Sequence, residues 1–101
     1  MPSALTAAQI RFLRGQAHDL KAILQVGGKG VTDAVAAELD GALEHHELVK
    51  LRIASDDRDE REAVIADLAG RSGASLVQRI GNVAVLYRPS TGKRQIVLPR
   101  P

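Results

Sequence analysis

The sequence contains no cysteine and no tryptophan, and its aromatic residues are limited to Phe12 and Tyr87. The lack of cysteine excludes disulfides, thiolate nucleophiles and cysteine-ligated metal sites. The shortage of aromatic rings argues against a sheet that stacks several bases on aromatic side chains. Long apolar runs are also missing, because charged residues interrupt the chain well before the roughly 20 residues that cross a bilayer. The opening Met1-Pro2-Ser3 does not resemble a signal peptide. We therefore expect a soluble, cytoplasmic protein.

The length of the chain limits the number of domains. With 101 residues, 45% of them hydrophobic, the chain can bury one core of moderate size. We expect a single domain over residues 1–90, followed by a basic, proline-containing tail over residues 91–101, and a monomeric protein. No serine-histidine-acid or paired-carboxylate arrangement stands out, because the acids crowd onto two helix faces. The sequence therefore predicts neither a catalytic site nor a cofactor.

Charge is unevenly distributed along the chain, although the net charge is only +2. Residues 1–32 carry a net charge of +3, residues 33–67 carry −7 and residues 68–101 carry +6. If the two terminal segments come together, their combined charge of +9 opposes an acidic middle. That layout is typical of a protein that binds a polyanion. The alternative is that dispersed surface charge only keeps the protein soluble.

The first predicted helix starts at about residue 7. Thr6 and Gln9 have the spacing of a capping box. An apolar stripe then faces the core, and a basic stripe lies beside it at i, i+3, i+7 spacing. Phe12 lies about 100° from the apolar stripe, where it would either stack on a base or pack at the edge of the core. The apolar stripe comprises Ile10, Leu13, Ala17 and Leu20, and the basic stripe comprises Arg11, Arg14 and His18.

The next segments alternate between strands and helices. The apolar run of residues 20–27 predicts a buried strand, and Thr32 is a suitable N-cap for a second helix whose outer face is acidic. Residues 47–54 alternate between apolar and polar positions, which predicts a strand with Lys50 and Arg52 on a solvated face. The acidic run "SDDRDERE" supplies the caps and the first-turn acids of a third helix, and two strands surround the turn at Gly81-Asn82. The fold class is thus α/β (α+β), with helices packed on one mixed four-stranded sheet.

The loop between the first strand and the second helix, "VGGKGVT", favours phosphate binding. It does not fit the Walker A pattern G-x-x-x-x-G-K-(S/T), because Ile23 replaces the first glycine and Gly30 replaces the hydroxyl residue. It also lacks the glycine spacing of a dinucleotide site. What remains is G-x-x-G, from Gly27 to Gly30. Its glycines allow close approach of a sugar-phosphate backbone, and Lys29 adds a positive charge. The alternative interpretation is a plain turn.

Three separated motifs resemble one family. The segments "RGQAHDLKAILQVGGKGVTDAV", "ALEHHELVKLRIA" and "NVAVLYRP" are similar to small bacterial RNA-binding proteins of the YhbY type, which consist of one CRM (chloroplast RNA splicing and ribosome maturation) domain. The resemblance extends from about residue 8 to residue 99. It implies a fold similar to the C-terminal domain of translation initiation factor three, with a KH-like G-x-x-G loop. It further implies association with precursors of the large ribosomal subunit, without enzymatic activity. Ala22 departs from the family pattern, which often has proline at this position, and Gly28 makes the loop more flexible than usual.

The resemblance and the charge pattern together select the residues that we expect to contact ribosomal RNA. The G-x-x-G loop and the start of the second helix would hold phosphates, and nearby cations would add charge. The rival hypothesis is a protein-interaction module that docks its acidic helix faces on a ribosomal protein. The predicted RNA-binding residues are Gly27, Gly28, Lys29, Gly30, Thr32, Arg11, Arg14, Lys21, Arg88, Lys93 and Arg94.

Residues 44–47, "EHHE", are the one stretch that suggests a metal site. Adjacent residues on a helix point about 100° apart, and no third ligand follows at a useful spacing. A polar helix end, with the histidines facing the negative pole of the helix dipole, explains the motif better. We therefore predict no metal site.

Overall fold

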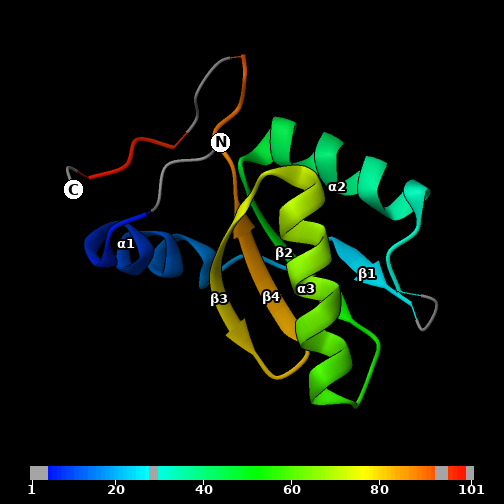
Figure 1. Cartoon of the computed structure of the whole chain (residues 1–101). Coiled ribbons are helices and arrows are strands. Elements are labelled where there is room, and N and C mark those ends of the chain that lie inside the picture. The colour runs from blue at the N-terminus through cyan, green and yellow to red at the C-terminus, as the bar shows by residue number, and fades with distance from the viewer. Residues whose placement is uncertain (1–4, 28–29, 93–95, 100–101) are drawn as a thin grey trace.

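The computed structural model describes residues 5–27, 30–92 and 96–99, which form three helices and one four-stranded sheet (Figure 1). The strands lie in the order β1-β2-β4-β3, with β1 parallel to β2 and the other two pairings antiparallel. The predicted mixed sheet and the predicted order of elements are confirmed. The elements are α1 (Ala7–Ala17), β1 (Leu24–Val26), α2 (Asp33–His46), β2 (Leu48–Ile53), α3 (Arg58–Ser72), β3 (Ser75–Ile80) and β4 (Val83–Tyr87).

Local hydrogen bonds begin α1 and α2 where the sequence predicts. Thr6 Oγ1 accepts from Gln9 N at 3.2 Å, and Gln9 Oε1 accepts from Thr6 N at 3.1 Å, which completes the capping box. Thr32 Oγ1 accepts from Val35 N at 3.2 Å at the start of α2. These bonds join residues three positions apart, so the local sequence is enough to predict them.

The strand predicted over residues 20–27 is wrong at its start, because β1 covers only three residues. Leu20 lies in a turn after α1, where its N–H donates to the Ala17 carbonyl at 3.0 Å. The chain reaches the sheet at Ile23, whose N–H donates to the Lys50 carbonyl at 3.0 Å. Leu20 and Ile23 remain 39% and 52% exposed. The turn is required because α1 packs on one face of the sheet, whereas β1 forms its edge.

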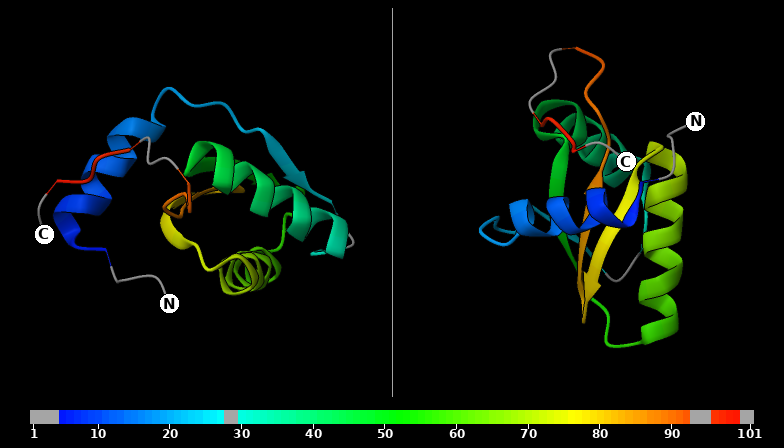
Figure 2. Two further views of the ribbon diagram at one scale, coloured as in Figure 1. Left: turned by 90° about the horizontal axis from the view of Figure 1, so that it is seen from above. Right: turned by 90° about the vertical axis from the view of Figure 1, so that its left-hand side faces the viewer.

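Two apolar clusters occupy opposite faces of the sheet. The larger joins the inward side chains of β1, β2 and β4 to α2 and α3. The smaller joins α1 to the other face and includes Leu13, Leu48, Val85 and Tyr87. Figure 2 shows α1 on the side of the sheet opposite α2 and α3. Phe12 packs against the smaller cluster. Of the two roles predicted for Phe12, base stacking and packing at the edge of the core, this is the second.

The solvated face predicted for residues 47–54 is only partly solvated. Leu48 points to this face and is buried under α1, because the helix crosses one end of the strand. Farther along β2, Lys50 and Arg52 line open hollows. One half of this sheet face is therefore covered by α1, and the other half is open.

The described part of the tail returns to α1. Ile96 and Leu98 pack against the smaller cluster, and Gln9 Nε2 donates to the Pro99 carbonyl at 3.0 Å. Residues 96–99 therefore lie beside α1, whereas the basic residues of the tail on which the charge prediction depends lie outside the described residues. The boundary predicted near residue 90 remains a prediction.

Candidate nucleic-acid interface

In the segment after β1, Gly30 N donates to the Gly27 carbonyl at 3.1 Å. Gly30 has φ of 75°, a left-handed conformation that only glycine adopts without strain. Gly27 is different, because its φ is not positive; a Cβ at either glycine would meet no heavy atom of the described residues within 4 Å. The positive φ therefore explains why residue 30 is glycine. At Gly27 the backbone does not require glycine, and the absence of a side chain leaves space for a ligand to approach. Gly28 and Lys29 lie outside the described residues.

The start of α2 offers less to an anion than the sequence suggests. The Thr32 hydroxyl oxygen accepts the capping bond from Val35 N, which leaves only its single O–H to donate to an anion. The exposed Asp33 carboxylate lies in the first turn and is 3.6 Å from Arg71 Nη1. A carboxylate at this position interacts favourably with the helix dipole itself and repels a phosphate. Most of the attraction for a polyanion must therefore come from basic side chains.

The predicted basic residues of the first helix are accessible. Arg11 and Arg14 are exposed on α1, and Arg14 Nε donates to the Val77 carbonyl at 3.3 Å. This bond ties one edge of the Arg14 guanidinium to the backbone of β3 without neutralising its charge. Lys21 is exposed in the segment between α1 and β1.

The predicted site is not one compact surface. α1 and the C-terminal end of β1 lie toward opposite ends of the molecule in Figure 1 and in the left-hand view of Figure 2. The chain runs from the end of α1 along the open half of the sheet face and then enters the edge strand β1. The open half of the sheet face therefore lies between the two ends. Lys50 and Arg52 project from this face beside β1. Neither cation is among the predicted RNA-binding residues, although the alternation of residues 47–54, which predicts a solvated face for both, is a signal for including them.

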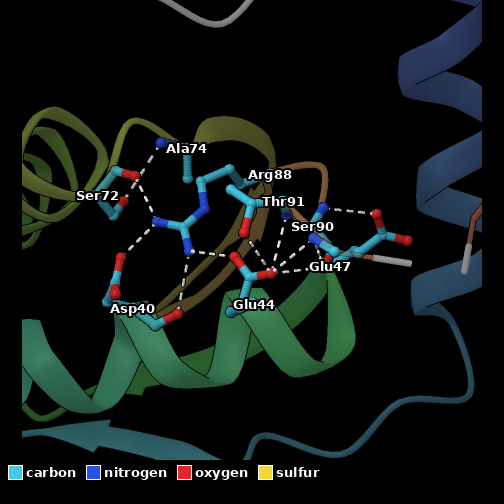
Figure 3. Close-up of polar contacts among 9 residues, drawn as sticks. Asp40, Glu44, Glu47, Ser72, Ala74, Arg88, Ser90 and Thr91 are labelled. Atoms are coloured by element: carbon cyan, nitrogen blue, oxygen red, sulfur yellow. Dashed lines mark hydrogen bonds and ion pairs between the residues drawn. The ribbon is translucent and has the colours of Figure 1, made fainter. Parts of the chain in front are cut away.

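Arg88 corrects the prediction, because the fold uses it internally (Figure 3). Its guanidinium donates from Nη1 to Asp40 Oδ1 at 2.6 Å and to the Ser72 carbonyl at 2.8 Å, and from Nη2 to the Asp40 carbonyl at 3.1 Å. The side chain is 17% exposed. Arg88 therefore ties β4 to both α2 and α3 and has no free face for RNA. Lys93 and Arg94, the other predicted residues of this region, lie outside the described residues.

Ion pairs divide the basic residues into two groups. Arg71, Arg79 and Arg88 pair with acids of α2 or α3. In the described part of the chain no ion pair involves Lys21, Lys50 or Arg52, and the same holds for the exposed Arg11 and Arg14. Arg58 and Arg61, which also have no ion pair among the described residues, lie near the acidic start of α3, whereas the other five cations lie on α1, on the segment after it and on the open sheet face. This side can therefore attract a polyanion, while the opposite side neutralises much of its own charge.

Two acids at the end of α2 have roles that the sequence did not reveal. Glu47 is fully buried, and its two carboxylate oxygens accept from Ser90 N and Ile96 N, each at 2.7 Å. Glu44 Oε2 accepts from the Ser90 hydroxyl at 2.6 Å and from both the hydroxyl and the N–H of Thr91 at 2.9 Å. These bonds, led by those from the Ser90 and Thr91 hydroxyls, lower the pKa of Glu44 to about 2. We call Glu44 and Glu47 the tail clamp. Its partners lie more than 40 residues away, so no local pattern signals it.

The histidines of "EHHE" form the polar helix end that the sequence predicts. His45 and His46 lie in the last turn of α2, with ring centroids 4.5 Å apart in a T-shaped contact. Among residues 5–27, 30–92 and 96–99, no group of three His, Cys, Asp or Glu side chains could hold a metal ion.

None of the helices in these ranges is long and apolar enough to cross a membrane.

Comparison with known proteins adds to this geometry. Residues 5–88 match the model of the CRS1/YhbY (CRM) domain. The chain is 42% identical over 98 residues to an RNA-binding protein of Haemophilus influenzae, covering 97% of this chain and 98% of the other. It is also 42% identical over 95 residues to the Probable RNA-binding protein YqeI of Bacillus subtilis, covering 94% and 99%. The solution structure of SAV1595 from Staphylococcus aureus, described as a candidate RNA-binding protein, matches with a TM-score of 0.82 and 33% identity over 95% of this chain and 100% of that one.

Proposed function

The chain belongs to the CRS1/YhbY (CRM) domain family, and on this basis we propose that it is an RNA-binding protein that acts without catalysing a reaction. The observation that carries the proposal is a group of five cations without ion pairs on one side of the described structure, namely Arg11, Arg14, Lys21, Lys50 and Arg52. A polyanion on that side gains attraction without first breaking an ion pair within the protein. The names of the relatives, which refer to RNA binding, support the same partner.

The proposed contacts are mainly with the RNA backbone. Lys29 and the glycines of the loop would hold phosphates at one end, and Arg11, Arg14 and Lys21 would supply charge at the other. Few aromatic rings are available to stack on bases, so recognition would depend more on backbone and shape than on base edges.

The resemblance to YhbY-type proteins extends the proposal to a cellular role. We infer that the RNA is ribosomal, in precursors of the large subunit, and that the protein assists their assembly in the cytoplasm. Contacts with ribosomal proteins would be secondary. Part of the acidic surface that the rival hypothesis requires is engaged internally, because Asp40 and Glu44 hold Arg88 and the tail.

Binding across a salt series tests the proposal. Lys29→Ala and Arg14→Ala should each weaken binding to fragments of large-subunit RNA, and each should make the salt dependence shallower by about 0.7 to 0.9 per lost phosphate contact. Arg79→Ala is a matched control, because it removes the same charge from a pair with Glu62 at 2.6 Å.

The rival hypothesis predicts a different pattern. Unchanged RNA affinity in both cation variants would refute the RNA proposal, particularly if Glu38→Lys on the exposed surface of α2 prevented association with precursor particles. Association of that variant at the normal level, with defects only in the cation variants, would support RNA binding.

A further inference from the structure

We propose that the open half of the sheet face is a seat for an unpaired stretch of RNA, with phosphates on Lys21, Lys50 and Arg52 and one base in an apolar hollow beside Ile23. This inference rests on the proposed function and specifies the form of RNA that this surface accepts. It also supplies the connection between the two ends of the predicted site.

Strand register places the necessary side chains together. β1 and β2 are parallel, with Leu24 opposite Leu51 and Gln25 opposite Arg52. Leu24 and Leu51 belong to the larger core, so the alternate residues face the other way. The bond from Ile23 N to the Lys50 carbonyl continues the pairing by one residue. The open face therefore presents an aliphatic side chain beside a lysine and an amide beside an arginine.

The first hollow is apolar in its walls and basic at its rim. It has a volume of about 240 Å³ and is lined by Leu20, Ile23, Leu48 and Ile96, with Lys21 and Lys50 among the polar residues. This volume is below the roughly 300 to 1,000 Å³ of pockets for drug-sized ligands and suits a smaller planar group. A nucleobase has that character, because its faces are apolar and its edges form hydrogen bonds.

The aliphatic side chains at this hollow are unusually accessible. Leu20 and Ile23 are two of the five large hydrophobic residues that the described part of the chain leaves exposed. A base covering them would remove apolar surface from water, which favours binding. In a chain so poor in aromatic rings, aliphatic contact of this kind would replace aromatic stacking.

A second hollow of about 620 Å³ continues the first along the sheet. The two hollows share Leu20, Lys21, Ile23 and Lys50, and the second adds Gln25 and Arg52. Gln25 is two residues from Gly27, so the trough leads from the end of α1 toward the glycine loop. An RNA strand lying in it would connect the two groups of cations that are separated at the ends of the molecule.

Charge and shape together select the occupant. None of the residues that line either hollow is acidic, and three are cationic, which favours a polyanion over a peptide of mixed charge. A duplex would offer its phosphates to the rim, but its bases are paired and could not enter the apolar hollow. An unpaired strand satisfies both the basic rim and the apolar floor.

Fluorescence anisotropy with labelled RNA tests the proposal. The probes are a 12-nucleotide single strand without self-complementarity and the duplex formed with its complement, each titrated with the full-length protein across a salt series. Lys50→Gln combined with Arg52→Gln should weaken single-strand binding by at least tenfold at low salt and lower the salt slope by about 1.4, or 0.7 for each lost contact.

Ile23→Ser separates base contact from charge. We expect it to weaken single-strand binding roughly fivefold with an unchanged salt slope, and to leave duplex binding unaltered. Leu76→Ser is the matched control, because Leu76 is similarly exposed on β3 and lines neither hollow. Methyl NMR of the unmodified protein provides an independent measurement, in which the Ile23 signals should shift on addition of the single strand and not of the duplex.

The possible outcomes distinguish this inference from the proposed function. Unchanged binding in the Lys50/Arg52 and Ile23 variants, with weaker binding in Lys29→Ala and Arg14→Ala, would refute the seat and leave RNA binding intact. Failure of every RNA probe to bind would refute both. Equal competition by oligoglutamate of the same charge would refute an RNA seat and assign the trough to an acidic protein segment.

Discussion

Replacing Glu47 by alanine should lower the free energy of unfolding by about 3 kcal/mol, because two buried hydrogen bonds to a carboxylate disappear together. Both bonds are 2.7 Å long, and they hold Ser90 N and Ile96 N. A hydrogen bond to a charged group contributes roughly 1.5 to 3 kcal/mol. The loss is partly offset, because the variant no longer buries a charge.

The backbone of Glu47 adds a second and more selective expectation. Its φ is 64° and its ψ is −43°, a conformation that residues other than glycine rarely adopt, and it is the one non-glycine residue of the described chain with positive φ. Alanine keeps the strain of this conformation, whereas glycine relieves about 1 kcal/mol of it. Glu47→Gly should therefore be more stable than Glu47→Ala, the reverse of the usual order in and around helices. Glu47→Gln, which retains one acceptor oxygen, should be more stable than Glu47→Ala as well.

Urea unfolding followed by circular dichroism measures these differences. A loss of about 3 kcal/mol should lower the melting temperature by roughly 12 to 24 °C for a domain of this size. An alanine variant as stable as the parent protein would refute the importance of the clamp. A glycine variant less stable than the alanine variant would refute the argument from backbone strain.

Three further predictions concern the clamp, the loop and the internal arginine. Because the pKa of Glu44 is lowered to about 2 in the folded protein, its contribution to stability is complete above its ordinary value near 4.5 and is lost as the pH falls toward 2. The amide signal of Thr91 should shift through this pH range, and Glu44→Gln should abolish that shift; a shift that persists in the variant would contradict the assignment. Gly30→Ala should cost about 1 kcal/mol of stability because φ is 75°, whereas Gly27→Ala should leave stability nearly unchanged and weaken RNA binding; equal melting temperatures for the two variants would argue against this. Arg88→Ala should lower the free energy of unfolding by about 2 kcal/mol and leave the salt slope of RNA binding unaltered, because the bonds of Arg88 are internal. A shallower slope in this variant would show that Arg88 contacts RNA.

Several parts of this protein follow from sequence alone because they depend on neighbouring residues. The capping box of Thr6 and Gln9 joins positions three apart, and the Thr32 cap does the same. The alternation along β2 predicted which side chains enter the larger core. Family membership was also accessible, because its motifs are separated but continuous stretches of sequence.

Tertiary structure decided what the charged residues do. Arg88 looked like a candidate RNA ligand until the fold placed Asp40 beside it, 48 residues away in the chain. Glu47 looked like part of a polar helix end and is instead buried beneath the tail. A charged side chain gives the same local pattern whether it faces solvent or a distant partner, and only packing distinguishes the two.

The open sheet face shows the same division most clearly. Sequence alternation placed Lys50 and Arg52 on the side of β2 away from the core, as the structure has them. It did not show that α1 would cover only one end of that side, burying Leu48 and leaving a trough beside Ile23. The direction in which a strand residue points depends on the local period of two. Whether anything covers it depends on where a helix more than 30 residues earlier in the chain comes to rest.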